Sequence, residues 1–163
     1  NHYSSDVTRT YPISGKFNDL QKKIYSIVLL ANKTIIDAIR PGIMLKDLQE
    51  LTKKTLIKGC LDAGLVKEAA ELEKYYFHNV SHHLGLDTHD ASEKDKPLAP
   101  GMVITVEPGL YFKEHKTGVR IEDDVLVTKD GHEVLSKEIA KEIDDIEKLF
   151  LGGEKNEKVC ISD

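Results

Sequence analysis

Histidines and carboxylates gather in this 163-residue sequence at spacings that could create a metal site. Four of the seven histidines fall within one short window, which holds His78, His82, His83 and His89. Any one of them alone is better explained as a surface residue or as a hydrogen-bonded core residue. Imidazole becomes a candidate metal ligand when carboxylates can reach the same point, so the acidic residues around these histidines decide between the two interpretations.

Two carboxylates stand in segments that are otherwise apolar and β-branched. Glu107 ends the segment Met-Val-Ile-Thr-Val, and the Pro-Gly that follows breaks a strand. Glu122 lies in an alternating segment, where Arg120 is expected on the same face because side chains repeat every second residue. Buried carboxylates are costly unless they are paired or bind a metal. Oxygen and imidazole ligands together suit Mn²⁺, Fe²⁺, Co²⁺ or Zn²⁺, and the absence of cysteine among them argues against a structural zinc site.

Helices would have to position these residues. Apolar residues at helical spacing predict a helix over about 20–38, capped by Asn18 or Asp19 and stopped by Pro41-Gly42. The same reasoning predicts three more helices, over about 45–63, 66–74 and 139–150.

Strands are predicted between the histidine window and the last helix, over 102–106, 119–127 and 133–136, with a hairpin turn at 129–131. Two long helices followed by strands and a final helix indicate an α+β fold, with helices on one face of an antiparallel sheet. The whole of 1–163 is expected to be one domain, with a flexible tail over 152–163.

Composition excludes some classes of partner. The net charge is −5 and no long basic tract is present, which disfavours nucleic acid. No apolar run is long enough to span a bilayer, so no membrane partner is expected. The two cysteines, Cys60 and Cys160, are far apart in the sequence and do not suggest a disulfide framework. A reducing, cytoplasmic location is therefore expected.

Four motifs, taken in this order, resemble the pita-bread metallopeptidases of the Xaa-Pro aminopeptidase or prolidase (Xaa-Pro dipeptidase) type. They are Ser5-Asp6-Val-Thr-Arg-Thr-Tyr-Pro, His78-Asn-Val-Ser-His82-His-Leu-Gly-Leu-Asp-Thr-His89-Asp, Leu-Ala-Pro-Gly-Met-Val-Ile-Thr-Val-Glu107-Pro-Gly-Leu-Tyr111 and Gly-Val-Arg120-Ile-Glu122-Asp-Asp. The resemblance implies a creatinase-aminopeptidase fold, in which helices pack on a curved antiparallel sheet. It also implies that 1–163 is part of a metallopeptidase catalytic domain, cut at its N-terminal side.

The resemblance assigns metal ligands to this sequence. Asp6 and Glu122 are similar to the carboxylates that bridge two metal ions, and His82 is similar to the one imidazole ligand. Glu107 is similar to a ligand that also transfers protons.

The resemblance assigns further roles around these ligands. His78 and His89 are similar to the two histidines that hold the substrate and the tetrahedral intermediate. Arg120 is similar to a residue that orients the ligands, and Tyr111 to a residue of the pocket wall. His83 has no assigned role and is expected to be structural.

The implied activity is that of an exopeptidase that hydrolyses the Xaa-Pro bond at the N-terminus of a short peptide. Two divalent ions are implied, with Mn²⁺ expected first and Co²⁺ or Zn²⁺ as alternatives. A further aspartate ligand of the family would lie before Asn1, so one ion is expected to bind well and the second poorly, with weak or no activity. The intact protein is expected to be a homo-oligomer, and unpaired sheet edges are expected to make this chain self-associate.

Two alternatives remain open on the same scaffold. One is a binding module that holds peptides without cleaving them, and the other is a creatinase-like hydrolase. Four potential ligands together with both accessory histidines favour an enzyme over a module that has lost catalysis.

Overall fold

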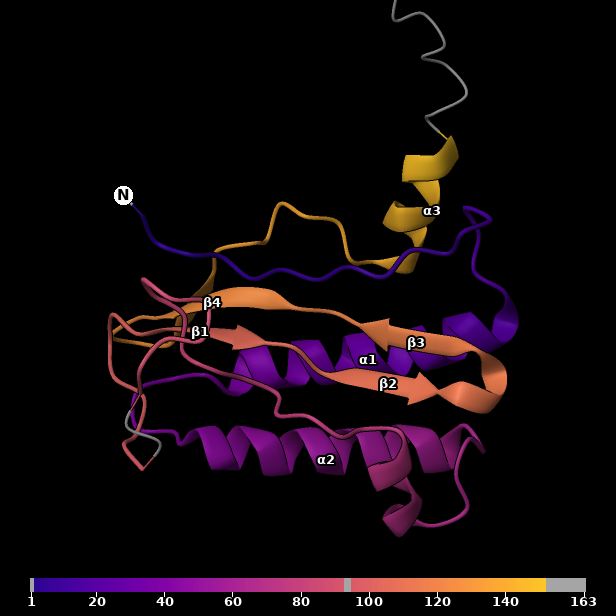
Figure 1. Cartoon of the computed structure of the whole chain (residues 1–163), viewed down its shortest axis with the longest axis horizontal. Helices are drawn as coiled ribbons and strands as arrows, with labels where there is room; N and C mark the ends of the chain where they lie inside the picture. The colour runs from indigo at the N-terminus through magenta and orange to yellow at the C-terminus, as the bar shows by residue number, and fades with distance from the viewer. Residues whose placement is uncertain (1, 93–94, 152–163) are drawn as a thin grey trace, which may run out of the picture.

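The computed structural model describes residues 2–92 and 95–151, in which two antiparallel sheets pack against a pair of long helices (Figure 1). The helices are α1 (Asp19–Ala38) and α2 (Leu45–Asp62), which contact each other along their lengths. Helices therefore cover one face of the sheets, and the predicted α+β arrangement is confirmed. The predicted flexible tail, 152–163, lies outside the described residues, as does Cys160.

Helix α1 begins and ends where the sequence predicts. The side chain of Asn18 accepts a hydrogen bond from the Gln21 amide, and the Gln21 side chain accepts one from the Asn18 amide, each at 2.9 Å. This reciprocal cap satisfies backbone donors that a helix start leaves free. The helix ends at Ala38, shortly before Pro41, and Gly64 follows α2 with a positive φ of 67°.

The strands form one long hairpin that is bent in its middle. Strand β1 (Val103–Val106) pairs with β4 (Asp123–Val127), and β2 (Gly109–Phe112) pairs with β3 (Thr117–Arg120). Val106 lies opposite Asp123 and Gly109 lies opposite Arg120, so both ladders keep one register. The two residues in each gap are therefore also opposite, which places Glu107 across from Glu122.

This bend corrects the predicted strand over 119–127, which is two strands in two different sheets. It also adds β2, a strand that the sequence did not predict. Pro108 has no amide hydrogen to donate to a ladder, which accounts for the interruption after β1. The Ile121 amide still donates to the Pro108 carbonyl at 3.3 Å, so the two sides of the bend remain in contact.

The remaining elements differ from prediction in extent. A 3₁₀ helix, η1 (Ala69–Lys74), replaces the third predicted helix, and the third predicted strand is β5 (His132–Val134), which pairs with β4. A second 3₁₀ turn, η2 (Lys113–His115), forms the hairpin tip.

The last helix, α3 (Ile143–Leu151), begins four residues later than predicted. The carbonyls of Ile139 and Ala140 accept hydrogen bonds from the Arg9 side chain, and that of Lys141 accepts one from the Tyr25 hydroxyl. Those carbonyls have partners outside a helix, which explains the later start.

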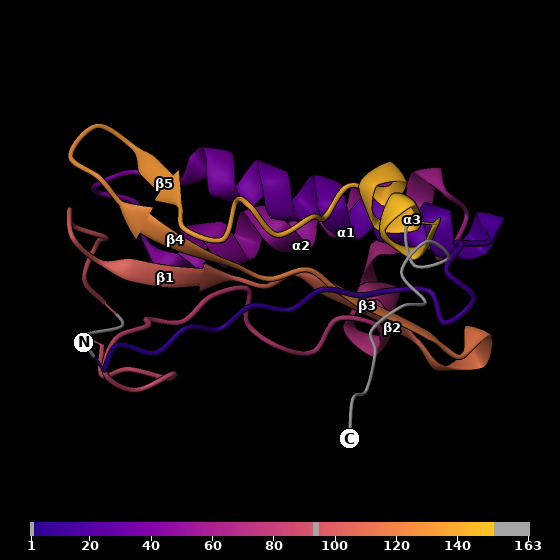
Figure 2. The same ribbon diagram turned by 90° about the horizontal axis from the view of Figure 1, so that it is seen from above.

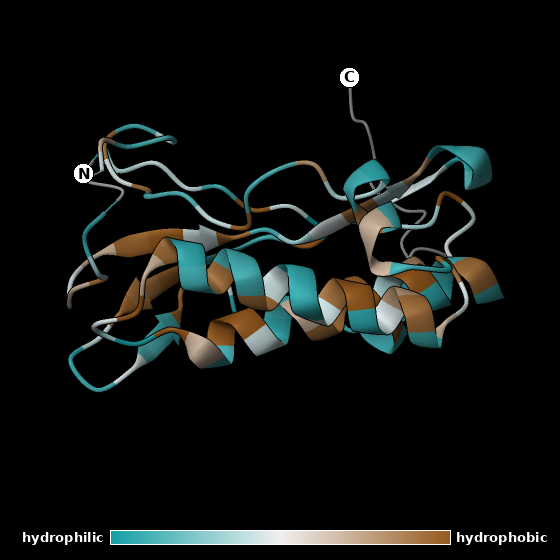
Figure 3. Ribbon diagram, turned by 90° about the horizontal axis from the view of Figure 1, so that it is seen from below, coloured by the Kyte–Doolittle hydropathy of each residue, from teal (hydrophilic) through white to brown (hydrophobic). Residues whose placement is uncertain are grey.

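Two apolar clusters fill the space between helices and strands. One joins α1 to β2, β3 and α3, and the other joins the ends of α1 and α2 to β1 and β4. Figure 3 shows hydrophilic and hydrophobic residues alternating along both long helices, as expected for helices with one buried and one exposed face. Among the described helices, none combines the length and the apolar character that crossing a bilayer requires.

The segment before α1 runs in an extended course alongside the strands (Figure 2). The Ser4 amide donates to the Gly85 carbonyl at 2.8 Å, and the Glu122 amide donates to the Thr8 carbonyl at 3.0 Å. These bonds bring the N-terminal segment to the bend of the hairpin, where Glu107 and Glu122 lie.

Candidate metal centre

A pocket of about 750 Å³ lies at the bend of the hairpin. All eight site residues expected from the sequence line it: Asp6, His78, His82, His89, Glu107, Tyr111, Arg120 and Glu122. Phe77, Asn79 and Ser81 complete its wall. Residues that are more than one hundred positions apart in the sequence are thus brought to one place.

The histidine segment is docked against β1 by backbone hydrogen bonds. The Thr105 amide donates to the His82 carbonyl at 3.0 Å, and the Glu107 amide donates to the Val80 carbonyl at 2.8 Å. The Thr105 hydroxyl in turn accepts from the His82 amide at 3.1 Å. These bonds fix the position of His82 relative to Glu107.

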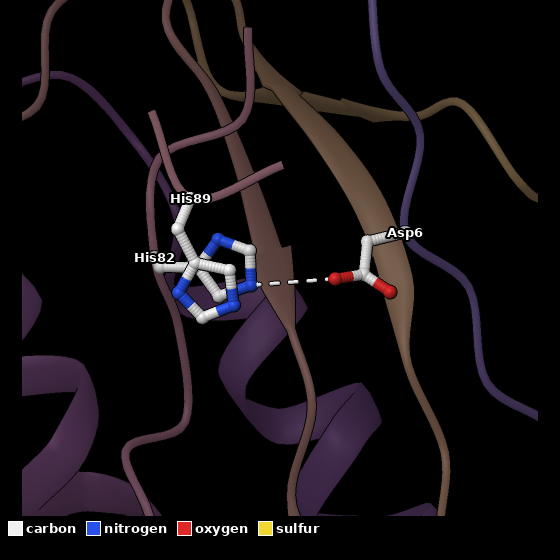
Figure 4. A group of neighbouring side chains, drawn as sticks. All are labelled: Asp6, His82 and His89. Atoms are coloured by element: carbon white, nitrogen blue, oxygen red, sulfur yellow. Dashed lines mark ion pairs between the residues drawn. The ribbon is translucent and has the colours of Figure 1, made fainter. Parts of the chain in front are cut away.

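The imidazole of His82 is held in one tautomer. Its Nδ1 lies 3.0 Å from the carbonyl oxygen of His83, which can only accept, so Nδ1 carries the proton. In the neutral ring Nε2 then presents a lone pair. This atom lies 3.5 Å from Oδ2 of Asp6 (Figure 4) and 3.5 Å from Oε1 of Glu107. A backbone carbonyl that fixes the tautomer of an imidazole is a common feature of metal-binding histidines.

Two overlapping groups of side chains could hold a metal ion among the described residues. One is Asp6, His82 and His89, and the other is His82, Glu107 and Glu122, each with ligand atoms within 4.8 Å of one another. Figure 4 shows the rings of His82 and His89 overlapping, and their centroids are 4.0 Å apart with 13° between the planes. His89, expected beside the substrate, is thus also close enough to be a ligand.

The carboxylates of the pocket repel one another. Burial, and then the neighbouring charge of Glu122, raise the pKa of Glu107 to about 7, although His82 and Arg120 oppose the rise. Burial also raises the pKa of Asp124, which lies outside the pocket lining, to about 6; the hydrogen bond from the Asp6 amide opposes the rise, and the charges of Glu122 and Asp6 add to it. Oxygen atoms and an imidazole lone pair converge here with too little positive charge to balance them, which is the donor set that a divalent cation fits.

The side chain of Glu122 is nearly inaccessible to solvent and is oriented by two neighbours. The Thr8 hydroxyl donates a short hydrogen bond to its Oε2, and the Arg120 guanidinium lies 3.8 Å from the same oxygen. Arg120 also donates from Nε to the Thr8 hydroxyl at 3.1 Å. Thr8 is not among the predicted site residues, although it lies in the same motif as Asp6.

His78 and Tyr111 form a linked pair on the opposite wall. The Nδ1 of His78 donates to the Asn79 carbonyl at 2.8 Å, so its Nε2 accepts from the Tyr111 hydroxyl at 2.9 Å. The Tyr111 hydroxyl lies so close to Gly109 that a Cβ there would be only 2.5 Å away. Gly109 therefore allows the ring of Tyr111 to lie against the strand.

Phe77 extends this aromatic wall and was also missed. Its side chain is 70% exposed, and its ring centroid lies 5.1 Å from that of Tyr111. The aromatic run Tyr75-Tyr76-Phe77 beside His78 was the available signal. His83 does not line the pocket, and burial lowers the pKa of its imidazole.

A family model described as metallopeptidase family M24 matches residues 1–129. The chain belongs to metallopeptidase family M24. Among M24 relatives, a Xaa-Pro aminopeptidase of Haemophilus influenzae is 39% identical over 167 residues, which cover 91% of this chain and 39% of the relative. The predicted resemblance is confirmed at the level of the family.

Solved M24 structures share the fold of this chain. A Bacillus anthracis protein assigned as an aminopeptidase P is 51% identical, with a TM-score of 0.91 over 93% of this chain and 36% of that one. The zinc-substituted aminopeptidase P of Escherichia coli, solved with product, is 35% identical, with a TM-score of 0.88 over 95% of this chain and 40% of that one. The chain thus spans about two fifths of the length of these relatives, and the predicted pita-bread fold class is confirmed.

Proposed function

We propose that this chain carries the metal-binding and substrate-binding residues of an exopeptidase that removes an N-terminal residue preceding proline. The observation that carries the proposal is the convergence of Asp6, His82, Glu107 and Glu122 in one pocket. Membership of family M24 and the likeness to Xaa-Pro aminopeptidases support it.

Asp6, His82, Glu107 and Glu122 would hold the divalent ion, with Mn²⁺ proposed first and Co²⁺ or Zn²⁺ as alternatives. A bound divalent ion lowers the pKa of a water molecule and polarises the peptide carbonyl. We propose that these four residues bind one ion tightly. His82 belongs to both groups of potential ligands, so a second ion in the pocket would have to share it.

Glu107 is proposed to move the proton of the reaction. In the metal-free chain, burial and the charge of Glu122 raise the pKa of its carboxyl group to about 7, so its surroundings favour a proton on this group. It lies at the bend, between the imidazole of His82 and the side chain of Glu122. A group in this position can take a proton from water and pass it to the leaving nitrogen of the Xaa-Pro bond.

His89 and the His78–Tyr111 pair are proposed to hold the substrate. The His89 ring is exposed beside His82, where it can face a bound peptide. Both ring nitrogens of His78 are already engaged, so His78 acts by fixing the hydroxyl of Tyr111. The rings of Tyr111 and Phe77 provide an apolar wall for a proline ring.

The test is release of the N-terminal residue from a short Xaa-Pro peptide by this chain with Mn²⁺, Co²⁺ or Zn²⁺. A matched Xaa-Ala peptide reports on the requirement for proline, and His82→Ala reports on the requirement for the metal site. Isothermal titration with Mn²⁺ in parallel should show one tight site.

The results of these measurements distinguish release of the N-terminal residue from binding of the peptide alone. Metal-dependent release that prefers proline and is lost in His82→Ala supports the proposal. Metal-dependent binding of the peptide that prefers proline, without release, would support the proposed metal-binding and substrate-binding roles, and would fit both weak activity with one ion and a non-catalytic peptide-binding module. Two equally tight Mn²⁺ sites would contradict the proposed stoichiometry, and no metal binding at all would overturn the proposal.

A further inference from the structure

One polar side chain is buried in the middle of the apolar face of α1. Asn32 is completely inaccessible to solvent, and the helix buries Val28, Ala31, Ile35 and Ile36 on either side of it. A buried amide is costly unless its donors and acceptor are all engaged. The hydrogen-bond partners of Asn32 therefore indicate why this buried position holds an amide and not an apolar side chain.

The amide nitrogen of Asn32 reaches both sides of the bent hairpin. It donates to the carbonyl of Val106 at 3.2 Å and to the carbonyl of Ile121 at 3.4 Å. Val106 directly precedes Glu107, and Ile121 directly precedes Glu122. One side chain thus binds the peptide units that lead into both carboxylates of the proposed metal site.

The oxygen of Asn32 is engaged as well. It accepts a hydrogen bond from the Lys141 ammonium at 2.8 Å, and the same ammonium donates to Asp123 at 2.7 Å. Asp123 follows Glu122 directly and has no exposed side-chain surface. The amide can therefore neither rotate nor exchange its two ends without losing a hydrogen bond.

We infer that Asn32 is a positioning residue, which sets the separation of Glu107 and Glu122 by binding the peptide units that precede them. The inference rests on the proposed function, because it concerns the ligands of that metal site. The gap in the hairpin lies between two separate ladders, and Pro108 can donate no backbone hydrogen bond within it. Within the gap one backbone bond, from the Ile121 amide to the Pro108 carbonyl at 3.3 Å, joins the two strands, and the amide of Asn32 adds a donor to each of them.

Two variants of the complete chain test the inference. Asn32→Leu removes the donors and the acceptor, and Asn32→Asp keeps the shape and the acceptor for Lys141 but removes the donors. The readouts are the dissociation constant and the visible absorption spectrum of bound Co²⁺, together with the melting temperature of the metal-free protein. If Asn32→Leu fails to fold, Asn32→Asp alone tests whether Asn32 positions the two carboxylates.

Thr52→Val is the matched control. Thr52 is equally buried, and its hydroxyl donates at 2.8 Å to the Leu48 carbonyl within α2, away from the hairpin. This variant also replaces a buried polar group by an apolar one.

Both Asn32 variants should bind Co²⁺ about tenfold more weakly and alter its spectrum, as expected for loss of a residue that orients ligands. Thr52→Val should lower the melting temperature without changing either Co²⁺ readout. Asn32 variants that bind Co²⁺ like Thr52→Val, while the parent chain binds it tightly, would overturn this inference alone. A parent chain that binds no Co²⁺ would overturn the proposed metal centre as well.

Discussion

Two carboxylates of the bent hairpin, Glu107 and Asp123, have opposite surroundings. Asp123 is completely buried, and burial alone would raise its pKa, but hydrogen bonds from Lys141, Ser136 and Arg9 hold the pKa below its usual range. Glu107 is also mostly buried, yet its nearest charged neighbours include another carboxylate, and its pKa rises to about 7. The hairpin thus has a neutralised side and an acidic side.

The difference follows from alternation along the chain around β4. Glu122 lines the pocket and accepts from the Thr8 hydroxyl, and Asp124 accepts from the Asp6 amide, whereas Asp123 between them contacts Arg9 and Lys141. Cations that belong to the chain balance Asp123, so that carboxylate stabilises the fold. No comparable set of cations balances the pocket carboxylates among the described residues, so these remain available to a ligand or a proton.

The largest effect on folding is expected from the neutralised side. Asp123→Ala should lower the free energy of unfolding by about 3–5 kcal/mol, because it leaves Arg9 and Lys141 buried without their partner. Urea unfolding of the metal-free chain measures this loss. Asp130→Ala is the control, since its ion pair with Lys129 is exposed on both sides and its removal should change little. Equal unfolding free energies of Asp123→Ala and Asp130→Ala would contradict the stabilising role of Asp123.

On the acidic side, a substitution should weaken metal binding and leave the stability of the metal-free chain nearly unchanged. His82→Ala should weaken Co²⁺ or Mn²⁺ binding by roughly a hundredfold or more, because it removes the ligand common to both potential groups. The metal-free variant should unfold at nearly the same urea concentration as the parent chain. His83→Ala, one residue away and outside the pocket, should keep its metal affinity in calorimetric titration.

Glu107 should give a smaller effect that depends on pH. Its folded-state pKa, about 7, lies above its ordinary value of 4.5, so the folded chain keeps a proton that the unfolded chain releases. Its contribution to stability is therefore complete below pH 4.5 and is lost as the pH rises to about 7.

Glu107→Gln should consequently gain in stability relative to the parent chain across this range, by about 1–2 kcal/mol near pH 8. Urea unfolding of both metal-free chains at several pH values measures the difference. A difference in unfolding free energy between the two chains that stays constant from pH 4.5 to 8 would show that the pKa of Glu107 is not raised in the folded chain.

Phe77 should give the smallest effect on stability, because its side chain is 70% exposed. Phe77→Ala should leave unfolding within about 0.5 kcal/mol of the parent chain. It should weaken binding of a Xaa-Pro peptide about fivefold, since a ring beside that of Tyr111 adds apolar contact area. Peptide titration of Phe77→Ala and of Tyr75→Phe, which loses only an exposed hydroxyl contact with Glu114, measures the difference.

The long helices and the pocket residues could be predicted from the sequence for different reasons. Apolar spacing and the Asn18 cap are local signals, so α1 and α2 were placed within about one residue. The eight pocket residues came from motifs whose order resembles a family, and the fold brings all of them together.

The bend and the network behind it could not be predicted, because both depend on partners far away in the sequence. Apolar and charged residues alternate over 119–122, and apolar residues typical of a strand follow at 125–127. Nothing local shows that Ile121 and Glu122 lie outside both ladders, opposite Pro108 and Glu107. The roles of Asn32 and Lys141 depend on contacts across more than seventy residues. In the sequence, Asn32 is only a polar residue on an otherwise apolar helix face, and Lys141 resembles any exposed lysine.

Because both ladders share one register, the position of Glu107 opposite Glu122 does not depend on how long the hairpin is beyond the bend. Glu107 faces Glu122 because of pairs that lie on either side of them, and the tip at Lys113–His115 takes no part in that choice. Evolution or an engineer can therefore lengthen, shorten or replace the tip without moving the two carboxylates relative to each other. The tip is therefore a place in this chain where a new loop can be added without moving Glu107 relative to Glu122.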